Sequence, residues 1–155
     1  MALRGSRCVC TWLDTLPFMH HIIYLSWATE PFSDEQLQAL LQQARRHNTE
    51  ADITGILVYG NGCFLQVLEG EEPAVRQLYE HIKLDGRHRN VAAYADKAVT
   101  QRAFAGWSMA FEAATPQQFD ELMGYLRPAD VTFDAARLPL VDVHLLDLLR
   151  SFTLP

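Results

Sequence analysis

The chain has 155 residues, 49% hydrophobic and 21% charged, which is typical of a globular protein large enough for one domain with its own core. A net charge of −6 argues against nucleic-acid binding, which normally needs a basic surface, and no apolar run approaches the length of a membrane span. The three cysteines, Cys8, Cys10 and Cys63, are too few for a disulfide framework, so we expect reduced thiols and a cytoplasmic protein.

Residues 1–19 show no clear strand or helix periodicity and no uninterrupted apolar core of the kind found in a signal peptide. We therefore expect an N-terminal extension that folds little. Met19 stands directly before the first strand-like segment and is an alternative start of the native protein.

The segment 21–27 is rich in β-branched and aromatic residues and is predicted to form the first strand, with Tyr24 and Ser26 on one face. Ser33 with Gln36 three residues later predicts a capping box at the start of a helix that ends near residues 47–48. Its predicted buried stripe, at spacings of three and four residues, is Leu37, Leu40, Leu41 and Ala44.

A hairpin is predicted next, with strands over 53–59 and 62–70 and a tight turn around Asn61. The second of these strands is apolar on both faces, which favours a central position in the sheet. Pro73 opens a second amphipathic helix, and strands are predicted over 91–98 and 107–111. The order β-α-β-β-α-β predicts an α+β ferredoxin-like sheet with both helices on one face and an extra short fifth strand. Helical spacing over 116–126 and 138–152 predicts C-terminal helices on the other face.

Gln66 lies in the middle of the central strand and faces the helices, together with Tyr24, Ser26 and Asn48. A buried carboxamide without partners costs about 1–3 kcal/mol, so either neighbouring backbone bonds it or it belongs to a site. A cleft between the two helices, with convergent amides and a phenol, would suit a planar heteroaromatic ligand. The predicted apolar lining of this cleft is Leu40, Leu41, Phe64 and Ile82.

The remaining polar residues indicate no catalytic centre. No nucleophile–base pair stands out, and the chain has no glycine-rich phosphate loop of the P-loop or Rossmann type. His81 and His88 are seven residues apart across a helix end, which favours a solvated pair over a metal site. Glu69, Glu71 and Glu72 are interpreted as solvated surface charge. We therefore predict neither an enzyme nor a metal site.

Several stretches between about residues 20 and 112 resemble the BLUF family, the blue-light photoreceptors that use FAD. They occur in family order and with family-like separations. The matching stretches are residues 23–26 (Ile-Tyr-Leu-Ser), 47–48 (His-Asn), 53–55 (Ile-Thr-Gly), 64–70 (Phe-Leu-Gln-Val-Leu-Glu-Gly), 85–88 (Asp-Gly-Arg-His) and 104–109 (Phe-Ala-Gly-Trp-Ser-Met).

The resemblance implies a cofactor and a role for each matching side chain. The cofactor would be non-covalent FAD, with FMN or riboflavin as alternative occupants. Tyr24 would donate an electron and a proton to the excited flavin, and Gln66 would rewire hydrogen bonds between that phenol and the ring. Trp107 and Met109, on the predicted fifth strand, would relay the signal. The implied cofactor-binding residues are Ser26, His47, Asn48, Phe64, Ile82, Asp85, Arg87 and His88.

On this interpretation the chain divides into the extension 1–19, a flavin-binding core over 20–112 and a C-terminal helical cap or output segment over 113–155. The last segment is too short for a cyclase or phosphodiesterase. The photoreceptor would then signal to a separate downstream protein or through a homo-oligomer, a dimer or larger. The alternative is a ligand-free interaction module of the same topology, in which Tyr24 and Gln66 are ordinary core residues.

Overall fold

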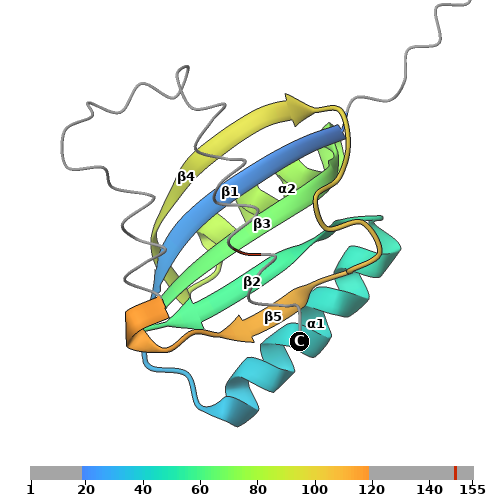
Figure 1. Ribbon diagram of the computed structural model, residues 1–155. Coiled ribbons are helices and arrows are strands. Elements are labelled where there is room, and N and C mark those ends of the chain that lie inside the picture. The colour runs from blue at the N-terminus through green and yellow to red at the C-terminus, as the bar shows by residue number, and fades with distance from the viewer. Residues whose placement is uncertain (1–18, 119–148, 150–155) are drawn as a thin grey trace, which may run out of the picture.

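The computed structural model describes residues 19–118 and Leu149. Its five-stranded sheet has the order β4-β1-β3-β2-β5, as Figure 1 shows. The strands β1 to β4 pair antiparallel, and β5 lies parallel to β2 at one edge. The predicted α+β ferredoxin-like arrangement with an extra fifth strand is confirmed. The strands are β1 (Met19–Ala28), β2 (Thr54–Gly60), β3 (Cys63–Glu71), β4 (His88–Val99) and β5 (Ala110–Ala113).

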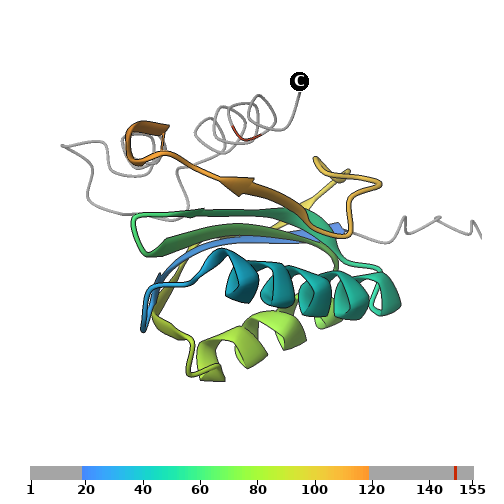
Figure 2. The ribbon, with the colours of Figure 1, turned by 90° about the horizontal axis from the view of Figure 1, so that it is seen from below.

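Two helices, α1 (Asp34–Glu50) and α2 (Glu72–Leu84), cover the same face of the sheet, as predicted (Figure 2). The predicted capping box opens α1: the Ser33 hydroxyl accepts the Gln36 backbone N–H at 3.2 Å, and the Gln36 side chain accepts that of Ser33 at 2.9 Å. α1 continues to Glu50, past its predicted end. Asn48 is therefore inside the last turn, and its side chain is buried.

The hairpin between β2 and β3 sets the register at the centre of the sheet. Its two-residue turn has positive φ at both Asn61 (52°) and Gly62 (72°), the backbone conformation of a type I′ turn. In the resulting register Gln66 on β3 lies opposite Leu57 on β2 and Tyr24 on β1. Gln66 is thus flanked by a paired strand on each side.

Each face of the sheet has its own apolar cluster. The inner cluster, between the sheet and the helices, includes Tyr24, Leu41, Phe64 and Leu68. The outer cluster consists of Ile23, Ile56, Val58, Cys63, Leu65, Val67, Tyr94, Phe104 and Leu149. Leu149 falls in the second predicted C-terminal helix and is fully buried in this cluster. Residues 1–18 and the rest of the predicted C-terminal helices beyond residue 118 lie outside the described residues. Within the described part of the chain, no helix is both long and apolar enough to cross a bilayer.

The start of the fifth strand differs from the prediction, because β5 begins at Ala110 and not at residue 107. The carbonyl of Ser108 accepts the Asn48 side-chain N–H at 2.9 Å, and that of Met109 accepts the Arg45 Nε–H at 3.0 Å. Because side chains of α1 bond these two carbonyls, the pairing of this segment with β2 begins only at Ala110. Trp107 and Met109 consequently precede β5.

We predict that Gly55→Ala destabilises the domain. A Cβ on Gly55 would lie 1.8 Å from the backbone carbonyl oxygen of Val67, on a strand that is paired on both sides. Overpacking of this kind costs about 1–3 kcal/mol or more of the free energy of unfolding, measurable by urea denaturation. Gly86→Ala is the control, since a Cβ there meets no atom of the described residues within 4 Å. An equal loss in the two variants would contradict the steric argument.

Candidate functional site

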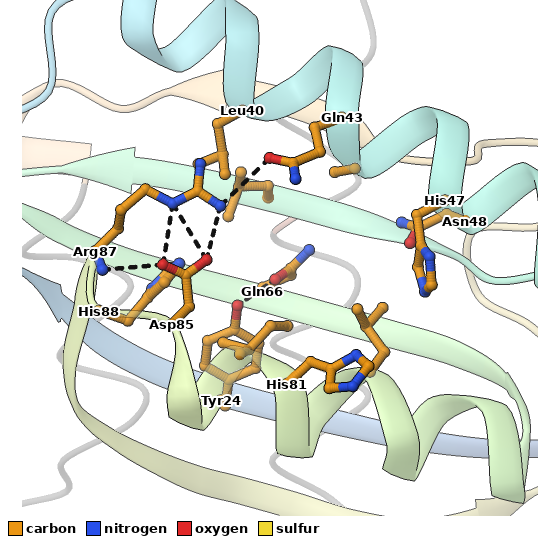
Figure 3. A pocket seen from close by; sticks show the side chains of 14 residues that line it. Tyr24, Leu40, Gln43, His47, Asn48, Gln66, His81, Asp85, Arg87 and His88 are labelled. Carbon is orange, nitrogen blue, oxygen red and sulfur yellow. Dashed lines mark hydrogen bonds and ion pairs between the residues drawn. The ribbon is translucent and has the colours of Figure 1, made fainter.

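A cleft lies between α1 and α2 above the centre of the sheet, with a volume of about 230 Å³. Ligand pockets for drug-sized molecules usually measure roughly 300–1,000 Å³. This smaller cleft therefore suits a ligand whose ring system is enclosed and whose remaining part lies outside. Figure 3 shows the side chains that surround it. They are Tyr24, Leu40, Gln43, Ala44, His47, Asn48, Leu57, Gln66, Leu78, His81, Ile82, Asp85, Arg87 and His88.

Each wall of the cleft follows the same helical spacing. The lining residues of each wall are spaced i, i+3, i+4 and i+7. Side chains with this spacing lie along one face of a helix. The same spacing is visible in the sequence, where it is equally typical of residues packed in a core. The four residues of the α1 wall are Leu40, Gln43, Ala44 and His47, and those of α2 and its end are Leu78, His81, Ile82 and Asp85. Those that the sequence analysis missed as lining residues are Gln43, Ala44, Leu57, Leu78 and His81.

Gln66 forms the floor of the cleft and is 6% exposed. Its Oε1 accepts a hydrogen bond from the Tyr24 hydroxyl, and its Nε2 donates to the Met109 sulfur at 3.4 Å. Both partners are side chains and not backbone groups. The carboxamide is therefore held between β1 and the segment that precedes β5, with one end on each.

Tyr24 is fully buried beside Gln66, and its ring packs on Tyr79 with centroids 5.6 Å apart. Burial raises the pKa of the Tyr24 phenol far above its ordinary value of 10.0, and the nearby Tyr79 and Asp85 raise it further. The phenol therefore stays protonated at neutral pH. It can act only as the donor in its bond to Gln66 Oε1.

Asn48 faces the cleft from the last turn of α1. Its Nδ2 donates to the Ser108 carbonyl, whereas its buried Oδ1 has no hydrogen-bond partner among the described residues. Leaving a buried acceptor unpaired costs about 1–3 kcal/mol, so native proteins normally supply a donor. The cleft thus presents an acceptor that a ligand N–H would satisfy.

The other end of the cleft carries charge. Arg87 donates to both carboxylate oxygens of Asp85, at 3.0 Å from Nε to Oδ1 and 2.7 Å from Nη2 to Oδ2, and it reaches Gln43 on α1 at 3.4 Å (Figure 3). The hydrogen bonds from Arg87 hold the pKa of the Asp85 carboxyl below its usual value. A guanidinium at the mouth of a cleft is well placed to bind phosphate.

His88 lies next to this pair and links two further residues to the cleft. Its Nδ1 is hydrogen-bonded to the Ser26 hydroxyl at 2.8 Å, and its ring packs on Phe64 with centroids 4.8 Å apart. Burial lowers the pKa of the His88 imidazole, which keeps the ring neutral at pH 7. Ser26 and Phe64 do not line the cleft themselves and contact it through His88.

The structure brings most of the predicted site residues together. Met109 contacts Gln66 from outside the cleft, whereas Trp107 is 37% exposed and packs its ring 5.9 Å from that of Phe104. Leu41 is buried in the inner cluster without lining the cleft. His81 and His88, interpreted as a solvated pair, both line the cleft, where His81 is exposed and His88 is half-buried. No group of metal-ligating side chains occurs among residues 19–118 and Leu149. The predicted residues that do line the cleft are Tyr24, His47, Asn48, Gln66, Ile82, Asp85, Arg87 and His88.

Comparison with known protein families gives a match over residues 19–110, which covers nearly all of the described sheet and both helices. The matching family is described as "BLUF: Sensors of blue-light using FAD". The chain belongs to the BLUF family. BLUF proteins are sensors, so the matched region is a photosensory and not an enzymatic domain, and FAD is its family's cofactor.

Relatives share this domain within chains of different size. Photoactivated adenylate cyclase subunit beta of Euglena longa is 39% identical over 89 residues, which are 57% of this chain but only 10% of the relative. The photo-activated structure of BlsA superposes with a TM-score of 0.67 at 26% identity, covering 88% of this chain and 96% of that one. Klebsiella pneumoniae BlrP1 gives a TM-score of 0.57 at 35% identity, over 61% of this chain and 24% of that one.

The residues of the cleft fit a flavin. Apolar side chains on both walls, among them Leu40 and Ile82, suit the faces of a planar ring. The unpaired Asn48 Oδ1 suits a ring N–H, and Arg87 at the mouth suits a phosphate. The volume matches a ligand of which only the ring system is enclosed.

We predict that Asn48→Ala weakens flavin binding about tenfold, because the variant lacks the side-chain oxygen and also frees the Ser108 carbonyl. The measurement is flavin retention during dilution, followed by fluorescence of the released cofactor. The control is Gln42→Ala on the exposed side of α1, which should bind like the wild type. Equal retention by both variants would remove Asn48 from the binding site.

Proposed function

We propose that the cleft binds FAD non-covalently and that the protein is a blue-light photoreceptor switched by rearrangement of the Gln66 side chain. The observation that carries this proposal is the buried carboxamide on the cleft floor, bonded to the Tyr24 hydroxyl at one end and the Met109 sulfur at the other. Residues 20–112 would form the flavin-binding core.

The lining residues divide into those that would hold the ring and those that would hold its phosphate chain. Asn48, with His47 one residue earlier, would bind the polar edge of the ring, and Ile82 would pack on its face. Arg87, fixed by Asp85, would meet the phosphates at the mouth, and neutral His88 would border the ring with Ser26 and Phe64 behind it. The bound flavin would supply blue-light absorption and an excited state that can oxidise a nearby phenol.

Tyr24 is the phenol that would respond. In the dark its raised pKa keeps the proton on its oxygen, in a hydrogen bond to Gln66 Oε1. Loss of an electron to the excited flavin would make this phenol strongly acidic, so its proton would leave along the existing bond toward Gln66 and, through it, toward the flavin that took up the electron. Return of the electron and proton restores the same phenol, and the protein turns over no substrate.

Gln66 can change its hydrogen bonds in response to this electron and proton transfer, because its side chain has two donors at one end and an acceptor at the other. A rotated carboxamide, or its tautomer, would present different groups to Tyr24 and Met109 without moving net charge. A thioether sulfur is a weak acceptor and no donor. Once Gln66 Oε1 faces the Met109 sulfur, the hydrogen bond between these two side chains would be lost. The segment before β5 would then no longer be bonded to Gln66.

The signal would leave through Trp107 and Met109. The carbonyls of Ser108 and Met109 accept hydrogen bonds from Asn48 and Arg45 on α1. A shift of Met109 would therefore displace the backbone between the cleft and β5. The receiver would be the segment 113–155 and, through it, a separate downstream protein or a second copy of the chain in a homo-oligomer. We propose that this occurs in the cytoplasm.

An absorption spectrum of the purified protein, recorded in the dark and directly after blue light, tests the proposal. We expect a yellow protein whose flavin band shifts to longer wavelength and relaxes in darkness. A colourless protein that also fails to take up added FAD, FMN or riboflavin would overturn it in favour of a ligand-free interaction module.

We predict that Gln66→Leu keeps flavin but loses the light-induced red shift, because leucine fills the floor without any group that can exchange hydrogen bonds. The measurement is the light-minus-dark absorption difference. Gln77→Leu, on the exposed side of α2, is the matched control and should shift normally. A wild-type shift in the Gln66 variant would refute the role given to this residue.

We predict that Tyr24→Phe retains flavin and abolishes formation of the normal red-shifted state, because phenylalanine has no hydroxyl proton to give. The neighbouring ring offers a control: Tyr79→Phe makes the same chemical change 5.6 Å away and should leave the shift intact. The yield of the red-shifted state per absorbed photon is the quantity to compare. Unchanged yield in Tyr24→Phe would exclude this phenol as the donor.

A further inference from the structure

Glu69 is a buried carboxylate on the face of the sheet opposite the cleft. Side chains alternate along β3, so Glu69 follows Leu65 and Val67 on the outer face and is 1% exposed. The interpretation of Glu69 as solvated surface charge was therefore wrong. Its Oε1 accepts the backbone N–H of Ala103 at 2.7 Å, and its Oε2 accepts that of Phe104 at 3.0 Å.

A short polar chain supports this carboxylate. The Thr54 hydroxyl, across the strand pair from Glu69, donates to Oε2 at 3.2 Å. The same hydroxyl accepts from Arg102 Nη1 at 3.1 Å, and Arg102 Nη2 donates to the Asp52 carbonyl at 2.8 Å. Arg102 therefore places a cation next to Thr54, which itself bonds the buried carboxylate. These groups belong to β2, β3, the connection between α1 and β2, and the connection between β4 and β5.

The segment that Glu69 holds passes from one face of the sheet to the other. Phe104 is buried in the outer cluster, whereas Met109 is buried in the inner cluster against Gln66. Between them the Trp107 carbonyl accepts the Gly55 N–H from β2 at 3.1 Å. The segment is fixed by Glu69 at its outer end and by the α1 side chains of Arg45 and Asn48 at its inner end.

We propose that Glu69 is a positioning residue for the photoresponse, which fixes residues 103–104 on the outer face and thereby holds Met109 against Gln66. With its outer end fixed, the segment passes a change at Met109 on to Trp107 instead of absorbing it by sliding. This inference rests on the proposed function. Among residues 19–118 and Leu149, no group bonded to Glu69 lines the cleft, so its effect is on the segment and not on the cofactor.

Glu69→Gln is a sharp test because it changes hydrogen bonding without changing size. A carboxylate accepts at both oxygens, but a carboxamide accepts at one end and donates at the other. In the variant, an NH₂ group would face one of the backbone N–H donors of Ala103 and Phe104, and one anchoring bond is lost. Glu71→Gln makes the same change at an exposed site two residues later and serves as the control.

The experiment uses the full chain loaded with flavin and measures three quantities in each variant. For Glu69→Gln we expect the amplitude of the red shift to be unchanged. We expect dark recovery to be slower by at least about threefold, because Met109 must return to its position against Gln66 from a segment that is less firmly anchored. We also expect hydrogen exchange of the Gly55 amide to be faster by about tenfold, with β1 and β3 unchanged. Glu71→Gln should match the wild type in all three.

Wild-type recovery and wild-type exchange at Gly55 in Glu69→Gln would overturn the proposal. So would faster exchange throughout the sheet with loss of the red shift, since that is the result of a merely structural residue. If Glu69→Gln does not fold, Thr54→Val removes one donor to Glu69 and should slow recovery in the same direction, with Thr54→Ser restoring it. Absence of any red shift in the wild type would refute the proposed function instead, while exchange at Gly55 still reports on the anchor.

Discussion

The hydrogen bonds of the Gln66 carboxamide are the constraint on which the rest of the site depends. A buried amide needs a donor at one end and an acceptor at the other, and here these come from β1 and from the segment before β5. The strand register places Tyr24 directly opposite Gln66, and the α1 side chains hold Met109 in reach. A small polar group thus fixes the relative positions of three separate parts of the chain.

The central strand connects this interaction to the other face of the sheet. Gln66 points inward to the cleft and Glu69, three residues later, points outward. Each bonds a different end of the segment between Phe104 and Met109. On the proposed mechanism, this segment would carry a local exchange of hydrogen bonds from the cleft toward the outer face of the sheet.

The fold was predictable because local patterns agree with it. Alternation along 62–70 gave the correct face for Gln66, and the Ser33 and Gln36 pair gave the correct start of α1. The sequence could not predict the start of β5, the bond from the Asn48 side chain to the Ser108 carbonyl or the burial of Glu69. All three depend on bonds between side chains and the backbone of residues 103–109, which lie more than thirty positions away in the chain. Such bonds leave no periodic signal.

The most direct test of the account is a light-minus-dark infrared spectrum of the flavin-loaded protein with ¹⁵N in its glutamine side-chain amides. If the Gln66 carboxamide rearranges, isotope-sensitive amide bands change on illumination, relax with the absorption shift and are missing from Gln66→Leu. If the flavin band shifts while no isotope-sensitive amide band changes, the carboxamide is a bystander, and the light response must be carried by other groups in the cleft.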